Sequence, residues 1–120
     1  MNNKYKDKPD IKGRTYNFAV RIIELVKKLP NNTIGFKLGA QLFSSGTSIG
    51  ANVEEATGAY SKEDFTYKMS IAFKEAKETH YWLRLIEDTN LLSSDLTWYL
   101  QEAREIKNIL GKTVKTSKQR

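Results

Sequence analysis

The chain has 120 residues and a net charge of +6, and it contains no cysteine. This length fits a single domain, and the lack of thiols excludes disulfide frameworks, thiolate metal sites and cysteine nucleophiles. The amino-terminal residues are polar, and no apolar run approaches the roughly eighteen residues of a membrane-spanning helix. We therefore expect a cytoplasmic protein without a membrane partner.

The charges are distributed unevenly along the sequence. Residues 1–53 hold nine lysines and arginines against three acids, residues 54–105 hold six against eleven, and residues 106–120 hold five against none. Basic ends around an acidic middle permit binding to an anionic polymer such as RNA or DNA. The same charges are consistent with solubility alone, and both interpretations stay open.

The first predicted helix begins at residue 14 or 15 and ends before Pro30. Apolar residues between these points recur every three or four positions, which is the spacing of an amphipathic helix. The preceding residues 1–13 contain a proline and a glycine, and they are predicted to form a flexible basic segment.

The second predicted helix runs from about Gly35 to Thr57 and is rich in small residues. Gly46 and Gly50 lie in its interior, where a glycine costs about 1 kcal/mol relative to alanine. Small side chains let another backbone approach closely. We therefore expect a neighbouring helix to pack tightly against this stretch.

A polar line of Ser48, Asn52 and Glu55 follows one face of this helix at spacings of four and three. Ser61 and Asp64 then resemble a capping box at the start of the third helix. We interpret these residues as a structural corner, in which Asn52 and Glu55 bond backbone groups of the next turn or helix. A catalytic role is the less favoured alternative.

The third predicted helix follows this corner and ends near Thr89. The fourth begins near Leu96 and is predicted to end at Gly111 or to fray beyond it, leaving residues 112–120 as a basic C-terminal tail. Four amphipathic helices with short connections, and no convincing strand, predict an all-α fold. The expected architecture is an antiparallel up-down-up-down four-helix bundle over residues 14–111.

The sequence offers little that indicates catalysis. Its only histidine, His80, has Lys77 three positions earlier, so the Glu-x-x-His motif of di-iron bundles is absent. The serines lack a nucleophile elbow, and the glycine-rich stretch lacks the Gly-Lys-Ser/Thr ending of a phosphate loop. We predict a protein that is not an enzyme and that uses no metal or cofactor.

The large aromatic residues of the third and fourth helices exceed what one bundle face can bury. A helix that is apolar beyond its bundle face usually has a second partner, and the simplest partner is another copy of the chain. The alternative is that exposed rings stack on nucleic-acid bases. The predicted interface residues are Tyr67, Tyr81, Trp82 and Trp98.

Basic residues near both ends of the chain are candidates for phosphate contacts without base specificity. The alternative is that these charges are solvated and that the protein is an interaction scaffold. The candidates are Arg14, Arg21, Lys27, Lys28, Lys37, Lys107, Lys112 and Lys115.

The run from Gln41 to Thr79 resembles the bacterial four-helix-bundle family of 23S rRNA intervening-sequence proteins. The resemblance covers roughly residues 16–111. The sequence departs from the family pattern at two places. Ala56 stands where glycine is commoner, and Phe43-Ser44 stands where many relatives carry an arginine pair that would add positive charge. The residues that carry the family signature are Ser48, Ile49, Asn52, Glu55, Ser61, Phe65, Ile71, Ala72, Ala76 and Glu78.

The resemblance implies a left-handed bundle that assembles as a cyclic homopentamer. It also implies kinship with the accessory variability determinant of diversity-generating retroelements, a basic pentamer that binds nucleic acid and a reverse transcriptase. Most members of the family have no established activity. Two functions therefore stay open: non-specific binding of RNA or DNA, or a scaffold for a protein partner without nucleic-acid binding.

Overall fold

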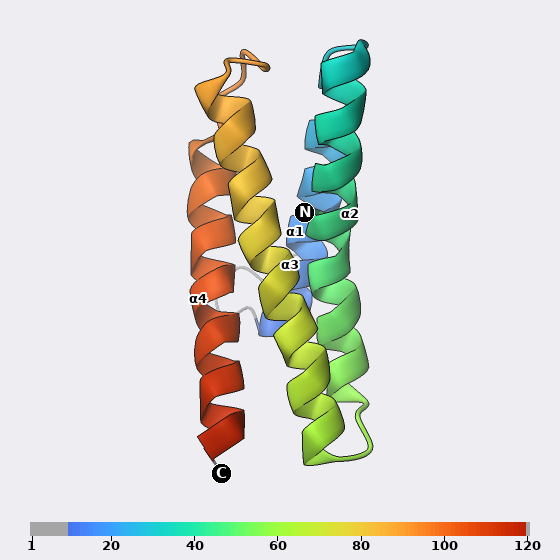
Figure 1. The fold of residues 1–120 in the computed structure, drawn as a ribbon, viewed down its shortest axis with the longest axis vertical. Coiled ribbons are helices and arrows are strands. Elements are labelled where there is room, and N and C mark those ends of the chain that lie inside the picture. The colour runs from blue at the N-terminus through green and yellow to red at the C-terminus, as the bar shows by residue number, and fades with distance from the viewer. Residues whose placement is uncertain (1–9, 120) are drawn as a thin grey trace.

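The computed structural model describes residues 10–119, and consecutive helices in it run in opposite directions (Figure 1). The predicted all-α fold with four helices is confirmed, and no strand occurs among the described residues. Residues 1–9 of the predicted flexible segment lie outside the described range. The four helices are α1 (Ile11–Val26), α2 (Thr33–Thr57), α3 (Lys62–Asp88) and α4 (Thr97–Gln119).

Side-chain caps determine where the first three helices begin. Asp10, Asn32 and Ser61 each accept a hydrogen bond from the backbone N–H three residues later, at 2.7, 2.9 and 3.0 Å. Such caps satisfy amide groups that have no partner inside the helix. The Asp10 cap starts α1 at Ile11, earlier than predicted, so the last residues of the predicted flexible segment are helical.

Glycines let α2 pack closely against α1, as the composition of α2 predicts. A Cβ atom on Gly46 would lie 2.8 Å from Cγ2 of Ile22, and one on Gly50 would lie 3.2 Å from the backbone oxygen of Thr15. Ile22 and Thr15 are fully buried. At these two glycines the backbone of α2 therefore lies directly against α1.

The fourth helix does not end at Gly111 but continues to Gln119, so most of the predicted C-terminal tail is helical. Gly111 has no positive φ angle, and a Cβ atom on it would lie 3.0 Å from a ring carbon of Phe73 in α3. This glycine therefore serves close packing of α3 and α4 and does not end the helix. Val114 and Ser117 are buried beyond it.

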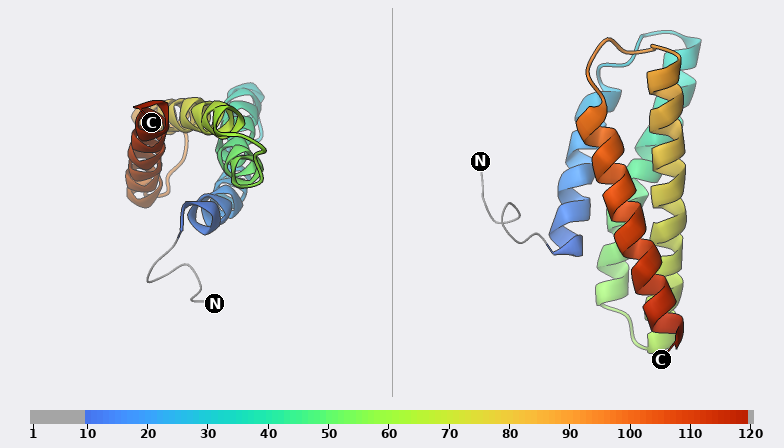
Figure 2. Two further views of the ribbon diagram at one scale, coloured as in Figure 1. Left: turned by 90° about the horizontal axis from the view of Figure 1, so that it is seen from below. Right: turned by 90° about the vertical axis from the view of Figure 1, so that its left-hand side faces the viewer.

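The helices follow one another around the core in chain order, so the side between α1 and α4 is the least closed (Figure 2). α1 packs mainly on α2, and α4 packs mainly on α3. α1 is also the shortest helix, with 16 residues against 27 in α3 and 23 in α4. Its amino-terminal end lies partway along α4 in the right-hand view of Figure 2.

Candidate nucleic-acid interface

Arg14, a predicted phosphate contact, is partly buried and is bound between α1 and α4. Its guanidinium group donates to Glu102 through Nε and Nη2 at 2.8 Å and to Glu105 through Nη2 at 2.6 Å. The hydrogen bond with Glu102 is the largest cause that raises the pKa of Arg14 above its ordinary value. Arg14 therefore joins α1 to α4, and its guanidinium group is already paired with two carboxylates.

Arg21 and Trp98 also pair with each other between α1 and α4. The guanidinium carbon of Arg21 lies 4.3 Å from the ring centroid of Trp98, within the range of a cation–π interaction. The Trp98 ring in turn packs against Phe18, with 6.2 Å between the ring centroids. Arg21 and Trp98 thus serve the contact between α1 and α4, although Trp98 keeps 38% of its surface exposed.

Three further candidates lie near the connection between α1 and α2. Lys27 forms an ion pair with Glu24 at 3.1 Å, and Lys28 and Lys37 are exposed. This connection lies at the opposite end of the bundle from the carboxyl terminus of α4 (Figure 1). The structure therefore does not bring the eight predicted basic residues together.

Cations do gather around His80, on the side where α3 and α4 meet. Burial is the largest cause that lowers the pKa of His80, and the positive charges of Lys107, Arg84 and Arg104 lower it further. Arg84 belongs to α3, whereas Arg104 and Lys107 belong to α4. Their shared effect on the pKa of one imidazole indicates that these cations lie on the same side of the bundle as His80.

Two more cations, Lys77 and Lys115, extend this group. We call the five residues the basic face: Lys77 and Arg84 of α3 with Arg104, Lys107 and Lys115 of α4. Seven positions separate the two cations of α3, and intervals of three and eight positions separate the three cations of α4. These intervals keep the side chains on one side of each helix. The Lys77 ammonium lies 4.4 Å from the ring centroid of Phe73, which packs against α4. None of the five forms an ion pair with a described carboxylate.

The sequence prediction included Lys107 and Lys115 of the basic face but missed the other three members. Acidic neighbours in the sequence, such as Glu75 and Glu78 beside Lys77, make α3 look neutral when charges are summed along the chain. The spacing of cations along one face of α3 and α4 is the signal that would have found Lys77, Arg84 and Arg104.

The four predicted interface aromatics do not form one surface. Tyr67 and Tyr81 are exposed on α3, but fourteen positions separate them, which is about 21 Å of helix. Trp82 is half-buried against the core, and its indole Nε1 atom is buried without a hydrogen-bond partner among the described residues. Trp98 lies between α1 and α4.

Exposed apolar residues gather instead on α2 beside the end of α1, a surface that the sequence prediction missed. Phe36 and Phe43 keep 61% and 47% of their surfaces exposed and lie seven residues apart on α2. They border a groove of about 420 Å³ that Val26, Leu29 and Pro30 line from the other side. The spacing of the two phenylalanines was a signal available in the sequence. We call these five residues the apolar face.

The four residues of the predicted structural corner make two kinds of contact. Ser61 caps α3, and Glu55 reaches that helix through an ion pair with Lys68 at 2.7 Å. Ser48 and Asn52 instead donate to carbonyl groups four residues earlier in α2, at 2.6 and 2.9 Å. They therefore bond within their own helix and do not hold the turn.

Within residues 10–119, no three acidic or histidine side chains come together in a way that suits a metal ion. No helix in the same range is long and apolar enough to cross a bilayer. The one remaining predicted cation, Lys112, lines a groove between α3 and α4, three residues before Lys115 of the basic face.

Comparisons with known proteins identify the family of this chain. A family model described as 23S rRNA-intervening sequence protein matches residues 8–112. A solved structure from Bacteroides thetaiotaomicron, described as a protein of unknown function from the S23 ribosomal protein family, is 40% identical with a TM-score of 0.79. The alignment covers 88% of this chain and 99% of the solved one. No curated protein matches the chain.

Proposed function

Since the chain belongs to the 23S rRNA-intervening sequence protein family, we propose that it is a non-catalytic cytoplasmic protein that binds RNA or DNA through the basic face. The observation that carries this proposal is that five cations share one side of α3 and α4 and that none of them forms an ion pair with a described carboxylate. Like charges held together repel one another, and the phosphates of a nucleic acid would relieve that repulsion by replacing small counterions.

The composition of the basic face favours contacts with the backbone of the nucleic acid over the reading of bases. Its five members are lysines and arginines, which bind phosphates in any sequence. Tyr81 is the exposed aromatic residue beside it, and Arg84 already lies 5.6 Å from the centroid of that ring. We therefore expect affinity that depends strongly on salt and weakly on sequence.

Replacing Lys107 and Lys115 with glutamate should weaken binding to a labelled RNA hairpin by about tenfold or more. Each phosphate contact contributes about 0.9 to the slope of log affinity against log salt on duplex DNA, so the slope should fall by about 2. Fluorescence anisotropy between about 50 and 200 mM salt measures both quantities.

The matched control is Lys28→Glu with Lys37→Glu, two exposed lysines whose reversal changes the net charge equally at the other end of the bundle. This variant should bind the RNA almost as well as the parent chain. An equal loss in both variants would show that total charge, and not the basic face, attracts the RNA. Lack of binding by the parent chain at the lowest salt would remove the proposal.

We further propose that copies of the chain associate through the apolar face, in a ring of five as the family resemblance implies. Phe36 and Phe43 expose large apolar areas beside a groove, and such patches usually mark an interface. A ring of five needs two different surfaces in contact, so a groove on one copy would receive side chains from the next.

Replacing Phe36 and Phe43 with aspartate should convert the assembly to the 13.8 kDa monomer. Light scattering after size exclusion measures the mass directly. The comparison variant, Tyr67→Asp with Tyr81→Asp, places the same charges on the exposed tyrosines of α3 and should leave the mass unchanged. Dissociation by the tyrosine variant alone would assign the interface to α3.

A further inference from the structure

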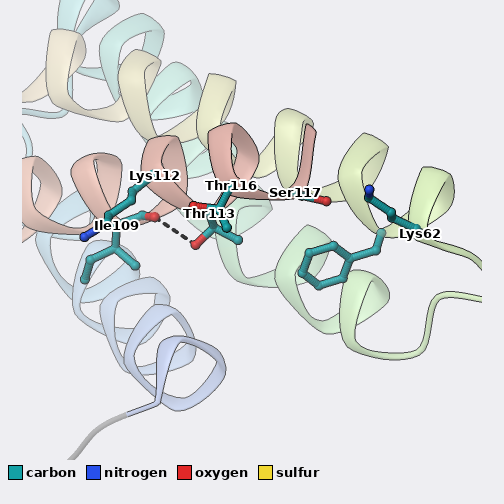
Figure 3. Close-up of a pocket in the computed structure, with 7 residues that line it drawn as sticks. Lys62, Ile109, Lys112, Thr113, Thr116 and Ser117 are labelled. Atoms are coloured by element: carbon teal, nitrogen blue, oxygen red, sulfur yellow. Dashed lines mark hydrogen bonds between the residues drawn. The ribbon is translucent and has the colours of Figure 1, made fainter. Parts of the chain in front are cut away.

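The face of α4 that holds α1 continues past the end of α1. Trp98, Glu102 and Glu105 contact α1 through Arg21 and Arg14. The same spacings of four and three then lead to Ile109, Thr113 and Thr116, which lie along the same side of the helix. These residues face a groove of about 640 Å³ whose lining comes from α3 and α4 (Figure 3).

The floor of this groove is apolar. It is formed by Phe65 of α3, which is half-buried, and Ile109 of α4, which is 37% exposed. The hydroxyl group of Thr113 donates to the carbonyl oxygen of Ile109 at 2.9 Å, so its hydrogen is already used within α4 (Figure 3). The groove therefore presents chiefly hydrocarbon, as expected of a surface that another helix covers.

The charge along this face changes sign where α1 ends. Beside α1, α4 presents Glu102 and Glu105, and α1 supplies Arg14 to both. At the groove, the charged residues are Lys62 and Lys112, and α4 holds no acid after Glu105. α1 is held because its arginine faces acids of α4. By the same charge complementarity, a helix that lies against the two lysines of the groove should carry acidic residues at its edges.

The chain's own amino-terminal segment is a poor match for this groove. Asp10 caps α1, so the helix does not extend beyond Ile11. Residues 1–9 contain three lysines and one aspartate, and they therefore have the same sign of charge as Lys62 and Lys112. The groove thus favours an occupant from another molecule.

We propose that this groove binds an amphipathic helix with acidic flanks from a partner protein, in the place that a longer α1 would occupy. Apolar residues of the partner would cover Phe65 and Ile109, and its carboxylates would pair with Lys62 and Lys112. This is helix-in-groove recognition, in which residues spaced three and four apart anchor the bound helix. The inference goes beyond nucleic-acid binding, because neither lysine belongs to the basic face.

The test uses a fluorescein-labelled peptide of 16 residues, the length of α1, with leucines at helical spacing and glutamates beside them. It should bind the full chain at about 0.15 M salt, where weak surface attraction is screened. Replacing Thr113 with tryptophan fills the groove and should weaken binding by about tenfold or more, as loss of a central anchor site does. A peptide with lysines in place of the glutamates should not bind.

Reversing the charges of the groove distinguishes a specific effect on peptide binding from a simple folding defect. The double variant Lys62→Glu with Lys112→Glu should prefer the lysine peptide, and a misfolded chain would not change preference in this way. A scrambled glutamate peptide, with the same charge but no helical stripe, should bind much more weakly than the periodic one. Equal binding of these two peptides, or no effect of Thr113→Trp, would overturn the proposal.

Two measurements separate this proposal from its alternatives. Thr113→Trp keeps every lysine and should leave RNA binding unchanged, whereas Arg84→Glu with Lys107→Glu, at two members of the basic face that do not line the groove, should leave peptide binding unchanged. Removing residues 1–9 should also leave peptide affinity unchanged. An increase of about tenfold on that removal would identify the chain's own segment as the occupant and contradict the proposal.

Discussion

Replacing Gly46 with leucine is expected to lower the free energy of unfolding by about 3 kcal/mol, the upper part of the range for overpacked cores. Even a Cβ atom at this position would lie 2.8 Å from Cγ2 and 3.1 Å from Cγ1 of Ile22. Ile22 is fully buried, so it cannot move aside without displacing α1 from α2. Urea unfolding followed by circular dichroism measures the loss.

The control for this prediction is Ser44→Leu, at an exposed position one half-turn away in the same helix. Leucine has a better helix propensity than both glycine and serine, so propensity alone would stabilise both variants. Only the clash with Ile22 predicts a large loss at Gly46 and little change at Ser44. Similar stability in the two variants would mean that α1 and α2 are less closely packed than described.

Replacing Arg14 with glutamate should cost about 2 kcal/mol, between the values for surface and buried ion pairs. Arg14 and Glu102 keep 20% and 15% of their side-chain surfaces exposed, so solvent screens them only in part. The substitution would place three carboxylates together between α1 and α4. Thermal unfolding at neutral pH measures the change, and Lys12→Glu, with the same charge change at an exposed site, is the control.

Acidification should reduce the difference between Arg14→Glu and the parent chain. Hydrogen bonds from Gln101 and then from Arg14 lower the pKa of Glu105, so its ionised form stabilises the fold above its ordinary pKa. That stabilisation is lost as the pH falls through the lowered pKa, because the carboxylate is then protonated. A stability difference that persists undiminished in strong acid would indicate that the ion pairs contribute little.

The helices could be predicted because the signals that form them are local. Apolar spacing, Pro30, and the Asn32 and Ser61 caps act within a few residues, so the sequence displays them directly. The end of α4 could not be predicted in this way. Glycine is a usual sign of a helix end, but Gly111 is required by the nearby ring of Phe73, a contact with another helix.

The candidate site was harder to predict because the role of a cation depends on what lies across from it. Arg14 and Lys115 look alike in the sequence, but Arg14 faces two glutamates on α4 and Lys115 has no described carboxylate within ion-pair distance. Phe36 was missed for a related reason. Its spacing from Phe43 is helical, but only the packed bundle shows that this face of α2 has no helix over it.

The arrangement of the helices in chain order also has a consequence for how the molecule folds. α1 packs mainly on α2, α2 on α3, and α3 on α4, so most contacts join segments that are near each other in the sequence. Loops between such neighbours cost little entropy to close, and chains of low contact order fold in about microseconds to milliseconds. We therefore expect the bundle to form by successive helical hairpins, with the pairing of Arg14 and Glu102 as a late, long-range step.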